Sequence, residues 1–286
     1  MSVTVAVVAM GEMGAGVAAR LTARGARVLT SLQGRSEASA RRAAAAGAQV
    51  VSGDAELVAD AGFVLSIVPP ARAADLARRL LPQIRAVDSR AVYVDCNAVA
   101  PQTVKAIAAP FAEAGVSFVD AGIVGGPPTA SGYTPRIYAS GADAEAFAAL
   151  GAHGLDIPVL SGAVGDASAL KMAYAGTTKG ASAVMVSMML GAMRAGVGEA
   201  FIAEMKDSQA GRLEAAARQL PAILKKAYRW DGEMEEIAKF LSADPGGPEI
   251  FRGAAELYRA LAADQAEGDG AGRLTRLQAY RDAMGG

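Results

Sequence analysis

The sequence predicts an α/β fold, a doubly wound parallel sheet, followed by an all-α C-terminal domain. Two observations carry this prediction. Short apolar, β-branched runs alternate with helical segments as far as residue 160, the pattern of a parallel sheet with helices on both faces. Beyond residue 160 the strand signals stop and helical periodicity continues. We therefore expect domains at 1–163 and 164–286.

The first expected strand is the valine-rich run that begins at residue 3, and a helix follows it to about residue 24. The other expected strands are 27–31, 49–51, 63–68, 91–95, 117–121, 136–140 and 158–160. The expected helices between them are 37–46, 55–60, 70–84, 101–114 and 142–151. The C-terminal domain opens with a long helix from Asp166, interpreted as its N-cap, to about residue 196. Further helices are expected near 199–207, 212–227, 232–242 and 248–263.

The turn after the first strand, Ala-Met-Gly-Glu-Met-Gly, has the spacing of a G-x-G-x-x-G dinucleotide fingerprint with alanine first. In that motif the second glycine lets the backbone approach a pyrophosphate, and the third allows close helix–strand packing. Both are present, as Gly11 and Gly14. The N–H groups and the dipole of the helix that begins near Met13 would favour the pyrophosphate in a Rossmann-type fold. The cofactor-binding residues expected here are Ala9, Met10, Gly11, Glu12, Met13 and Gly14.

The end of the second strand, residues 30–36, predicts which dinucleotide binds. An NAD site usually carries an acidic residue here for the ribose 2′-hydroxyl, and this stretch has none. Arg35 offers a planar fork for a 2′-phosphate, and Ser31 and Ser36 can donate to it. The alternative is an ordinary solvated loop in which Ser36 caps the next helix. We predict NADP in preference to NAD.

Further candidate residues follow later strands, because ligands in such sheets bind beyond the carboxyl ends of the strands. Val68 and Pro69 would form an apolar wall against the nicotinamide. Asn97 offers a donor and an acceptor to the ring or to the substrate. The backbone at Gly125 and Gly126 could approach a substrate carboxylate, or could simply form a stiff turn.

Lys171 lies in the second turn of the long helix. At helical spacing it shares a face with Tyr174, Ala175, Thr178 and Ser182, an unusual stripe in a helix of Ala, Met and Val. Burial and the helix dipole both disfavour a charged lysine near a helix N-terminus, and a proton-transferring lysine needs a lowered pKa. The alternative is a surface lysine whose stem lies along an apolar helix.

Together these motifs resemble the β-hydroxyacid dehydrogenases, relatives of 6-phosphogluconate dehydrogenase, over residues 1 to about 200. The segments that carry the resemblance, in the family's order and spacing, are 9–14, 66–70, 95–101, 120–126 and 165–171. More narrowly, three segments are similar to a branch with its own C-terminal domain type that is labelled only as an NAD(P)-dependent oxidoreductase. They are 30–36, 120–128 and 226–238.

The resemblance implies a homodimer with its active site in the interdomain cleft. It also implies a catalytic lysine, matched by Lys171, that moves a proton while C4 of the nicotinamide takes or gives a hydride. Two family contacts to substrate are missing, because the expected serine is Val124 and the expected asparagine is replaced by Tyr174-Ala175. Tyr174 and Thr178 are the predicted replacements, since both carry a hydroxyl. The substrate can therefore be bulkier or less acidic than a small 3-hydroxy acid.

The predicted function is an NADP-dependent oxidoreductase that interconverts an alcohol, such as a hydroxy acid, and its carbonyl. Lys171 is the general acid/base, and Asn97, Gly125 and Gly126 position the substrate. One alternative is an imine reductase or reductive aminase on the same scaffold. Those enzymes usually carry Asp or Tyr at the lysine position, so Lys171 opposes this reading while Tyr174 supports it. The other alternative is a non-catalytic NADP-binding sensor.

Three acidic residues near the C-terminal domain's only tryptophan, Trp230, have two interpretations. Glu233, Glu235 and Glu236 fit a solvated helix start favoured by the dipole, or acids that reach the cleft and select a cationic or hydroxylated substrate. Trp230 is interpreted as a packing residue.

Composition and charge exclude several kinds of partner. The formal net charge is −1 with both signs interspersed, so we expect neither nucleic acid nor an anionic membrane surface. The single cysteine, Cys96, is interpreted as a small buried apolar residue, and no Cys or His cluster predicts a metal. The uncharged stretch 180–193 is too short to span a bilayer, and the N-terminus lacks signal-peptide features. These observations predict a cytoplasmic protein with a small-molecule partner.

Overall fold

The computed structural model describes residues 3–283. The chain divides into two compact units, one that ends at Met172 and one that begins at Ala173. Each unit is described by itself.

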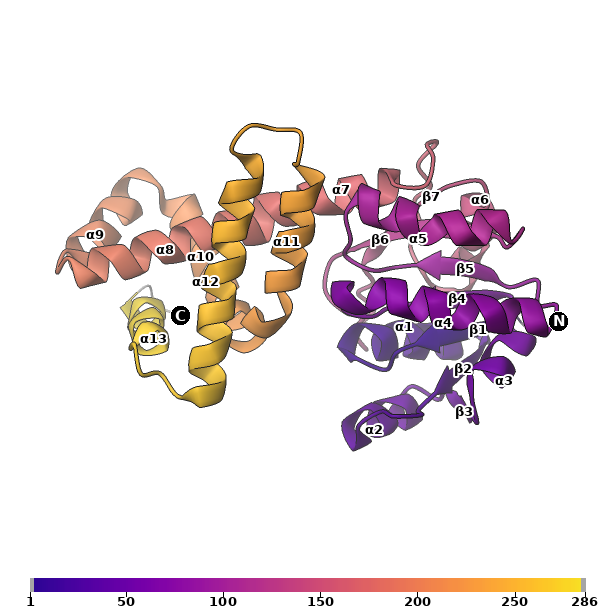
Figure 1. Ribbon diagram of the computed structural model, residues 1–286. Coiled ribbons are helices and arrows are strands. Elements are labelled where there is room, and N and C mark those ends of the chain that lie inside the picture. The colour runs from indigo at the N-terminus through magenta and orange to yellow at the C-terminus, as the bar shows by residue number, and fades with distance from the viewer. Residues whose placement is uncertain (1–2, 284–286) are drawn as a thin grey trace. The chain divides into compact units, whose positions relative to one another are not determined.

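The first unit contains a seven-stranded sheet in the order β3-β2-β1-β4-β5-β6-β7 (Figure 1). All neighbouring strands are parallel except β7, which runs antiparallel to β6. The chain builds outward from β1 in one direction and then returns to build from β4 in the other, so the strand order reverses between β1 and β4. The strands are β1 (Thr4–Val8), β2 (Arg27–Ser31), β3 (Gln49–Val51), β4 (Phe63–Ser66), β5 (Val92–Asp95), β6 (Phe118–Val124) and β7 (Arg136–Ser140).

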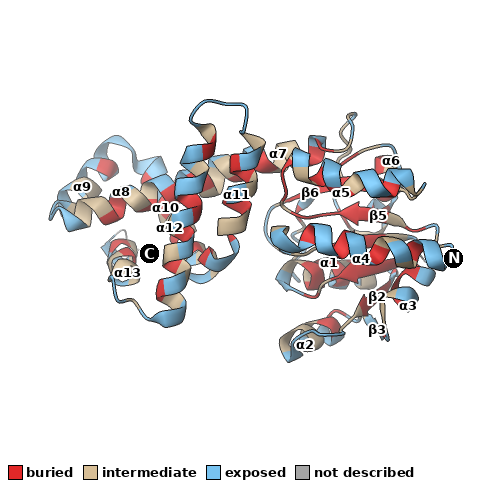
Figure 2. Cartoon of the chain, in the orientation of Figure 1, coloured by how far each residue is buried: buried red, intermediate tan, exposed pale blue. Residues whose placement is uncertain are grey.

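Helices cover both faces of this sheet, and the strands between them are buried (Figure 2). Val5 and Val7 belong to one apolar cluster while Ala6 and Val8 belong to another, because successive strand residues point to opposite faces. The helices are α1 (Glu12–Ala23), α2 (Glu37–Ala45), α3 (Asp54–Ala59), α4 (Ala73–Ala86), α5 (Pro101–Glu113) and α6 (Ala144–Ala148), with 3₁₀ turns η1 (Pro70–Arg72) and η2 (Ala149–His153).

The second unit is helical throughout its described residues, and α11 and α12 lie side by side in it (Figure 1). Trp230 is buried, and its ring packs edge-on against Tyr258 with centroids 5.2 Å apart, which confirms its packing role. The helices are α7 (Asp166–Ala175, which begins in the first unit), α8 (Ala181–Arg194), α9 (Gly198–Ser208), α10 (Ala210–Lys226), α11 (Asp231–Phe240), α12 (Gly247–Glu267) and α13 (Arg273–Ala283), with a π-helical turn η3 (Gly176–Gly180) and a 3₁₀ turn η4 (Ala227–Arg229).

Two predictions about these elements are wrong. The segment 158–160 is not a strand and forms only an isolated bridge from Val159 to Ala139. The long helix is interrupted by the π-helical turn η3. A Cβ on Gly180 would lie 2.5 Å from Cε1 of Phe251, so the glycine lets this ring pack against the turn. Helical periodicity in the sequence does not reveal a π turn.

Candidate active site

The glycine turn, residues 9–14, lies at the carboxyl end of β1, where the strand order reverses. Gly11 is the N-cap of α1. A Cβ on Gly14 would lie 2.0 Å from the carbonyl oxygen of Ala9, so only glycine fits there, whereas a Cβ on Gly11 would meet no atom within 4 Å. The turn therefore combines close helix–strand packing with open space at the N-terminus of α1, which suits a dinucleotide pyrophosphate.

Arg42 contacts the glycine turn, and the sequence analysis did not predict this contact. It lies on α2, is partly buried, and its Nε donates to the carbonyl oxygen of Met10 at 2.8 Å. Met10 is itself buried in the apolar cluster on that face of the sheet. The Arg42 guanidinium therefore ties the glycine turn to α2. The sequence signal is weak, because Arg41 and Arg42 are adjacent on a polar helix and nothing in their spacing distinguishes them.

The end of β2 has the composition predicted for it, without an acidic side chain between residues 30 and 36. The Ser36 hydroxyl caps α2 by accepting from the N–H of Ser39 at 3.3 Å, as the alternative interpretation expected. A hydroxyl that accepts one bond still has a proton to donate. Arg35 is exposed directly before this helix N-terminus, and Ser31 accepts from the N–H of Gln33 at 3.4 Å. A cation and a helix N-terminus therefore stand together at the end of β2, an arrangement that favours an anionic group.

Asn97 joins the carboxyl ends of β4 and β5. Its Oδ1 accepts from the N–H of Val68 at 2.7 Å, and its Nδ2 donates to Ser66 Oγ and Asp95 Oδ1, both at 2.8 Å. The side chain is 3 % exposed. Both amide hydrogens are thus used inside the protein, and the residue fixes the Val68-Pro69 segment that was predicted to face the nicotinamide.

Asp95 and Asp120 are buried neighbours. They are paired in register on β5 and β6, with exposures of 1 % and 0 %. Burial, followed by the nearby charge of Asp120, raises the pKa of Asp95 to about 7, although hydrogen bonds from Asn97 oppose the shift. One oxygen of Asp95, Oδ2, has no hydrogen-bond partner within residues 3–283. Asp95 therefore titrates in the folded protein far above its ordinary range.

We expect Asp95→Asn to flatten the pH dependence of stability. The unfolded carboxyl ionises near its ordinary pKa of 3.8, but the folded one holds its proton to about pH 7. The native state binds the extra proton in this window, so the wild type loses stability as pH rises, by about 1.4 kcal/mol per pKa unit of the shift. Urea unfolding at pH 5 and pH 8 measures this, and an equal slope in the variant would contradict it.

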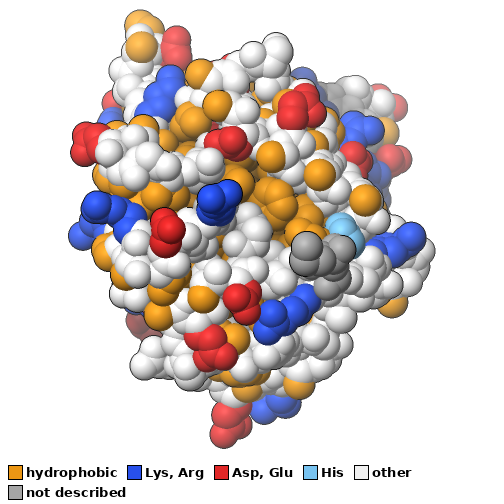
Figure 3. All heavy atoms as spheres, turned by 90° about the vertical axis from the view of Figure 1, so that its right-hand side faces the viewer, with side chains coloured by type: hydrophobic (Ala, Val, Ile, Leu, Met, Phe, Trp, Pro, Cys, Tyr) orange, Lys and Arg blue, Asp and Glu red, His pale blue; other side chains and the backbone are white. Residues whose placement is uncertain are grey.

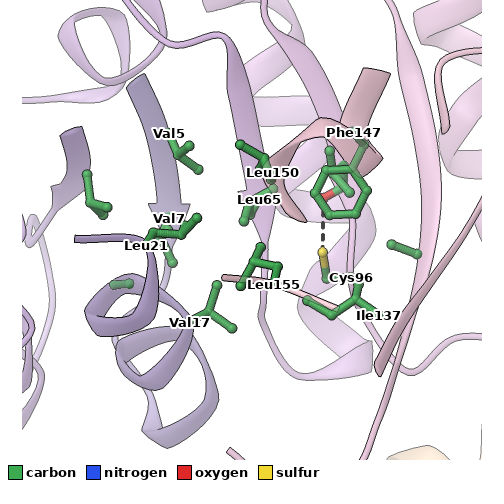
Figure 4. Close-up of a cluster of buried hydrophobic side chains, with 14 of the residues drawn as sticks. Val5, Val7, Val17, Leu21, Leu65, Cys96, Ile137, Phe147, Leu150 and Leu155 are labelled. Carbon is green, nitrogen blue, oxygen red and sulfur yellow. Dashed lines mark hydrogen bonds between the residues drawn. The ribbon is translucent and has the colours of Figure 1, made fainter. Parts of the chain in front are cut away.

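Cys96 is buried, as predicted, and its side chain points into the apolar cluster that contains Val17, Leu65 and Phe147 (Figure 4). Its Sγ donates to the carbonyl oxygen of Val94 at 3.9 Å. Burial raises the pKa of the thiol well above its ordinary value, and the charges of Asp95 and Asp120 add to the shift. A thiol in this setting is not a nucleophile.

Lys171 stands close to the carboxyl end of β6. A Cβ on Gly122 would lie 2.9 Å from Cβ of Lys171 and 2.7 Å from the carbonyl oxygen of Ala167, so α7 rests directly on this glycine. Lys171 is partly buried. Strand β6 ends only two residues later, at Val124, on the edge of the sheet where the parallel strands end. The lysine is therefore held within the first unit at the ligand-binding edge of such sheets.

Asp166 does not cap α7, which corrects the prediction. It is exposed and is the first residue of the helix. The cap comes instead from Asp120 on β6, whose Oδ2 accepts from the N–H groups of Gly165 at 2.8 Å and Ser168 at 3.0 Å. A side chain from another element replaces the local cap, so the sequence around Asp166 could not reveal it.

The glycine pair after β6 forms a turn closed by Tyr133. The N–H of Gly126 donates to the Tyr133 hydroxyl at 3.2 Å, and Gly125 has a φ of +125° that favours glycine. The carbonyl oxygen of Tyr133 accepts from Arg20 on α1 at 3.1 Å. The turn is thus held against the helix that begins at the dinucleotide fingerprint.

The predicted stripe on the long helix changes where the π turn begins. The Thr178 hydroxyl donates to the carbonyl oxygens of Tyr174 at 3.0 Å and Ala175 at 3.3 Å. Its proton is therefore used in a hydrogen bond to the backbone of the turn. A π turn holds an extra residue, and Ser182 therefore does not keep the angular position that a regular helix predicts. Tyr174, which precedes the turn, is 49 % exposed and keeps its place relative to Lys171 on α7.

Glu233 is not part of a solvated helix start, which corrects that interpretation. It is 5 % exposed, and its Oε2 accepts from Nζ of Lys179, which also lies 5.3 Å from the centroid of the Trp230 ring. The packing of α11 beside η3 buries it, and single-helix periodicity does not show this. Glu235 is exposed and pairs with Arg259 at 2.8 Å. Glu236 is partly buried.

No group of three or more His, Cys, Asp or Glu side chains within residues 3–283 could hold a metal ion. No helix in the same range is long and apolar enough to cross a membrane. On the face drawn in Figure 3, basic and acidic side chains are interspersed, and neither sign gathers into one patch.

Residues 4–152 match the model of the NAD binding domain of 6-phosphogluconate dehydrogenase. The chain belongs to this family. Residues 192–261 match a domain of unknown function, DUF1932. The first match covers the β-sheet and ends within η2, and the second lies within the helical second unit.

This member of the 6-phosphogluconate dehydrogenase family is similar to two proteins that are described as uncharacterised or of unknown function. A conserved protein of unknown function, solved and described as structurally similar to 3-hydroxyacid dehydrogenases, is 32 % identical, with 94 % of this chain and 99 % of that one covered and a TM-score of 0.67. An uncharacterised 28.5 kDa protein of Methanothermus fervidus is 26 % identical over 75 % of this chain and 81 % of its own.

The fold extends to enzymes of known activity. Mycobacterium tuberculosis 3-hydroxyisobutyrate dehydrogenase, solved with L-serine, has a TM-score of 0.72 at 19 % identity, with 98 % of this chain and 100 % of that one covered. Imine reductases share the fold as well, at 17 % and 20 % identity. The chain therefore has an NAD(P)-binding fold like that of the hydroxyacid dehydrogenases, and this likeness by itself does not distinguish the two reactions.

Proposed function

We propose that this protein is an NADP-dependent oxidoreductase that interconverts an alcohol, such as a hydroxy acid, and its carbonyl compound. The observation that carries the proposal is the placement of Lys171, held against Gly122 at the carboxyl edge of the sheet that bears the dinucleotide fingerprint. When bound, the nicotinamide supplies or accepts the hydride. Lys171 Nζ takes the hydroxyl proton during oxidation and returns one to the carbonyl oxygen during reduction.

In this proposal, residues 9–14 hold the pyrophosphate, and Ser31, Arg35 and Ser36 hold the 2′-phosphate. Val68 and Pro69, fixed by Asn97, form the wall beside the nicotinamide. Gly125, Gly126, Tyr174 and Thr178 are the proposed substrate-positioning residues, and Asn97, whose side chain is enclosed, acts through the Val68-Pro69 segment. The proposed domains are an NADP-binding domain of 1–163 and a substrate and dimerisation domain of 164–286. The free buried thiol of Cys96 fits a reducing cytoplasm.

Arg35→Ala should reduce the preference for NADP. The exposed guanidinium is the cation at the end of β2, and a charge-assisted bond to phosphate contributes about 1.5–3 kcal/mol. We therefore expect the Kd for NADPH to rise about 10- to 100-fold and the Kd for NADH to stay within about twofold. Titration of both cofactors by fluorescence measures this. Arg41→Ala, on the helix that follows Arg35, is the control, and equal weakening of NADPH and NADH binding would contradict the assignment.

The function is tested by the NADP(H)-linked absorbance change on a panel of hydroxy acids, polyols, and ketones with and without amines. Turnover of an alcohol or its carbonyl alone supports the dehydrogenase. Turnover only with ketone and amine together would replace it with imine reduction, the reading that Tyr174 on the Lys171 helix favours. Tight NADPH binding with no turnover on any compound would favour a sensor.

We also propose a homodimer formed through α8. Ala181, Val184 and Met188 recur at helical spacing on this helix, and the last two are 55 % and 56 % exposed. Such an apolar stripe is typical of a protein contact.

Met188→Glu should convert the dimer to a monomer, because it would bury a charge in the contact. Light scattering over a concentration series measures the molar mass. Ile250→Glu is the matched control, since Ile250 is 59 % exposed on a different helix. A monomeric wild type, or a dimer that survives Met188→Glu, would refute the α8 contact.

A further inference from the structure

The N-terminus of α7 is capped from the sheet and not from its own sequence. The first N–H groups of a helix have no partner within it and need acceptors from elsewhere. Gly165, just before the helix, has a φ of +114°, and its N–H donates to Asp120 Oδ2. Asp120 is completely buried, on β6. The acceptor is therefore a side chain 45 residues earlier in the chain.

Asp120 collects bonds from both sides of this helix end. Its Oδ2 also accepts from the N–H of Ser168 at 3.0 Å and from Ser140 Oγ at 3.1 Å, and its Oδ1 accepts from Ser168 Oγ at 2.6 Å. Ser140 Oγ in turn accepts from the N–H of Ala167 at 3.0 Å. One carboxylate and one hydroxyl thus hold the N–H groups of residues 165, 167 and 168.

The charge of the carboxylate suits this position. A negative group at a helix N-terminus is stabilised by the dipole, and the bonds from Ser168, Gly165 and Ser140 favour the ionised form. Burial opposes them and raises the pKa of Asp120. An amide of the same shape could keep an oxygen toward the N–H groups of Gly165 and Ser168 and turn its NH₂ toward the Ser168 hydroxyl, so it would remove the charge but keep part of the cap. Alanine at residue 120 would remove every acceptor that Asp120 supplies.

The same strand fixes Lys171. Gly122 is two residues after Asp120 and therefore on the same face of β6. The helix touches the strand at Gly122, through Ala167 and Cβ of Lys171, and is capped at Asp120. Lys171 follows Ser168 by less than one helical turn. A shift of the capped end would move the lysine along the strand.

We propose that Asp120 is a positioning residue that, with Ser140 and Ser168, sets where Lys171 stands. The proposal rests on the proposed function for its catalytic consequence, but the placement itself can be tested without a substrate.

The first experiment measures the placement in Asp120→Ala, which removes both carboxylate oxygens of the cap. Mass spectrometry follows the rate at which trinitrobenzenesulfonate labels Lys171, with Lys225, exposed on α10, as the internal reference. We expect labelling of Lys171 to rise about tenfold with Lys225 unchanged, since an uncapped first turn opens. Amide exchange of residues 165–168 should accelerate in this variant and not in Asp95→Ala, which removes a buried carboxylate whose Oδ1 accepts from Asn97. Unchanged labelling and exchange would overturn the proposal.

The second experiment is a double-mutant cycle with a substrate from the panel. Asp120→Ala should lower kcat about 10- to 100-fold, as expected for a misplaced catalytic group, with the NADPH Kd within about twofold. In a Lys171→Ala background it should cause no further loss, because its effect passes through the lysine. An equal loss in both backgrounds would overturn the positioning role. A Lys171→Ala variant with full activity would instead refute the proposed function, while the labelling result would stand on its own.

Discussion

Lys171→Ala is expected to lower kcat about 10²- to 10⁴-fold, the usual contribution of a general acid/base. The Kd for NADPH should stay within about twofold, because the fingerprint and the end of β2 lie on other elements of the sheet. The loss should be smallest at high pH in the oxidation direction, where hydroxide can take the proton from the alcohol. The measurements are steady-state kinetics from pH 6 to pH 10 and a fluorescence titration of NADPH.

Two variants separate charge from proton transfer. Lys171→Arg keeps the positive charge but cannot release a proton at these pH values, so it should remain as slow as Lys171→Ala. Lys225→Ala removes an exposed lysine of α10 and should match the wild type. An active Lys171→Arg enzyme would show that the lysine supplies charge only, and an active Lys171→Ala enzyme would remove it from the mechanism.

Gly14→Ala is expected to destabilise the first unit and to abolish dinucleotide binding. The new Cβ would stand 2.0 Å from the carbonyl oxygen of Ala9. Neither atom can move without its main chain, so the strand and the helix must separate. Overpacking of this kind costs about 1–3 kcal/mol or more. Thermal unfolding without cofactor measures the loss of stability, and a fluorescence titration with NADPH measures the loss of binding.

Gly11→Ala is the matched partner of that variant. A Cβ at Gly11 meets no atom within 4 Å, so the unfolding midpoint without cofactor should be unchanged. If a pyrophosphate approaches the backbone there, the same methyl group should raise the NADPH Kd at least about tenfold. Unchanged NADPH affinity in Gly11→Ala would mean that the cofactor does not lie against this turn.

Several parts of the fold were predictable because their signals are local. The strands at 27–31, 49–51 and 136–140 occur with the predicted bounds, and the change from alternating strands to helices is found where the composition changes. Burial of Cys96 followed from the apolar strand that precedes it. Proline and glycine mark these boundaries through backbone sterics, which act over one or two residues.

Other features depended on contacts between distant residues. The sequence predicts that the Ser36 hydroxyl binds a phosphate, and in the structure the same hydroxyl caps α2. The sequence does not separate the two roles, because each needs a polar side chain at the start of a helix. The local sequence predicts a solvated Glu233, whereas the packing of α11 buries it against Lys179. The π turn that interrupts the long helix packs against Phe251, which lies about 70 residues further along the chain.

The sequence by itself determined the fold class, the dinucleotide turn and the presence of a lysine early in the helix that follows the sheet. Each of these features follows from the spacing of glycine, apolar and charged residues over short stretches of the chain. Only the tertiary structure decided that Arg42 holds Met10, that Asn97 is enclosed between two strand ends, and that Asp120 caps α7. The physical reason is that a buried polar group must find its partners in space, and those partners need not be near it in the chain.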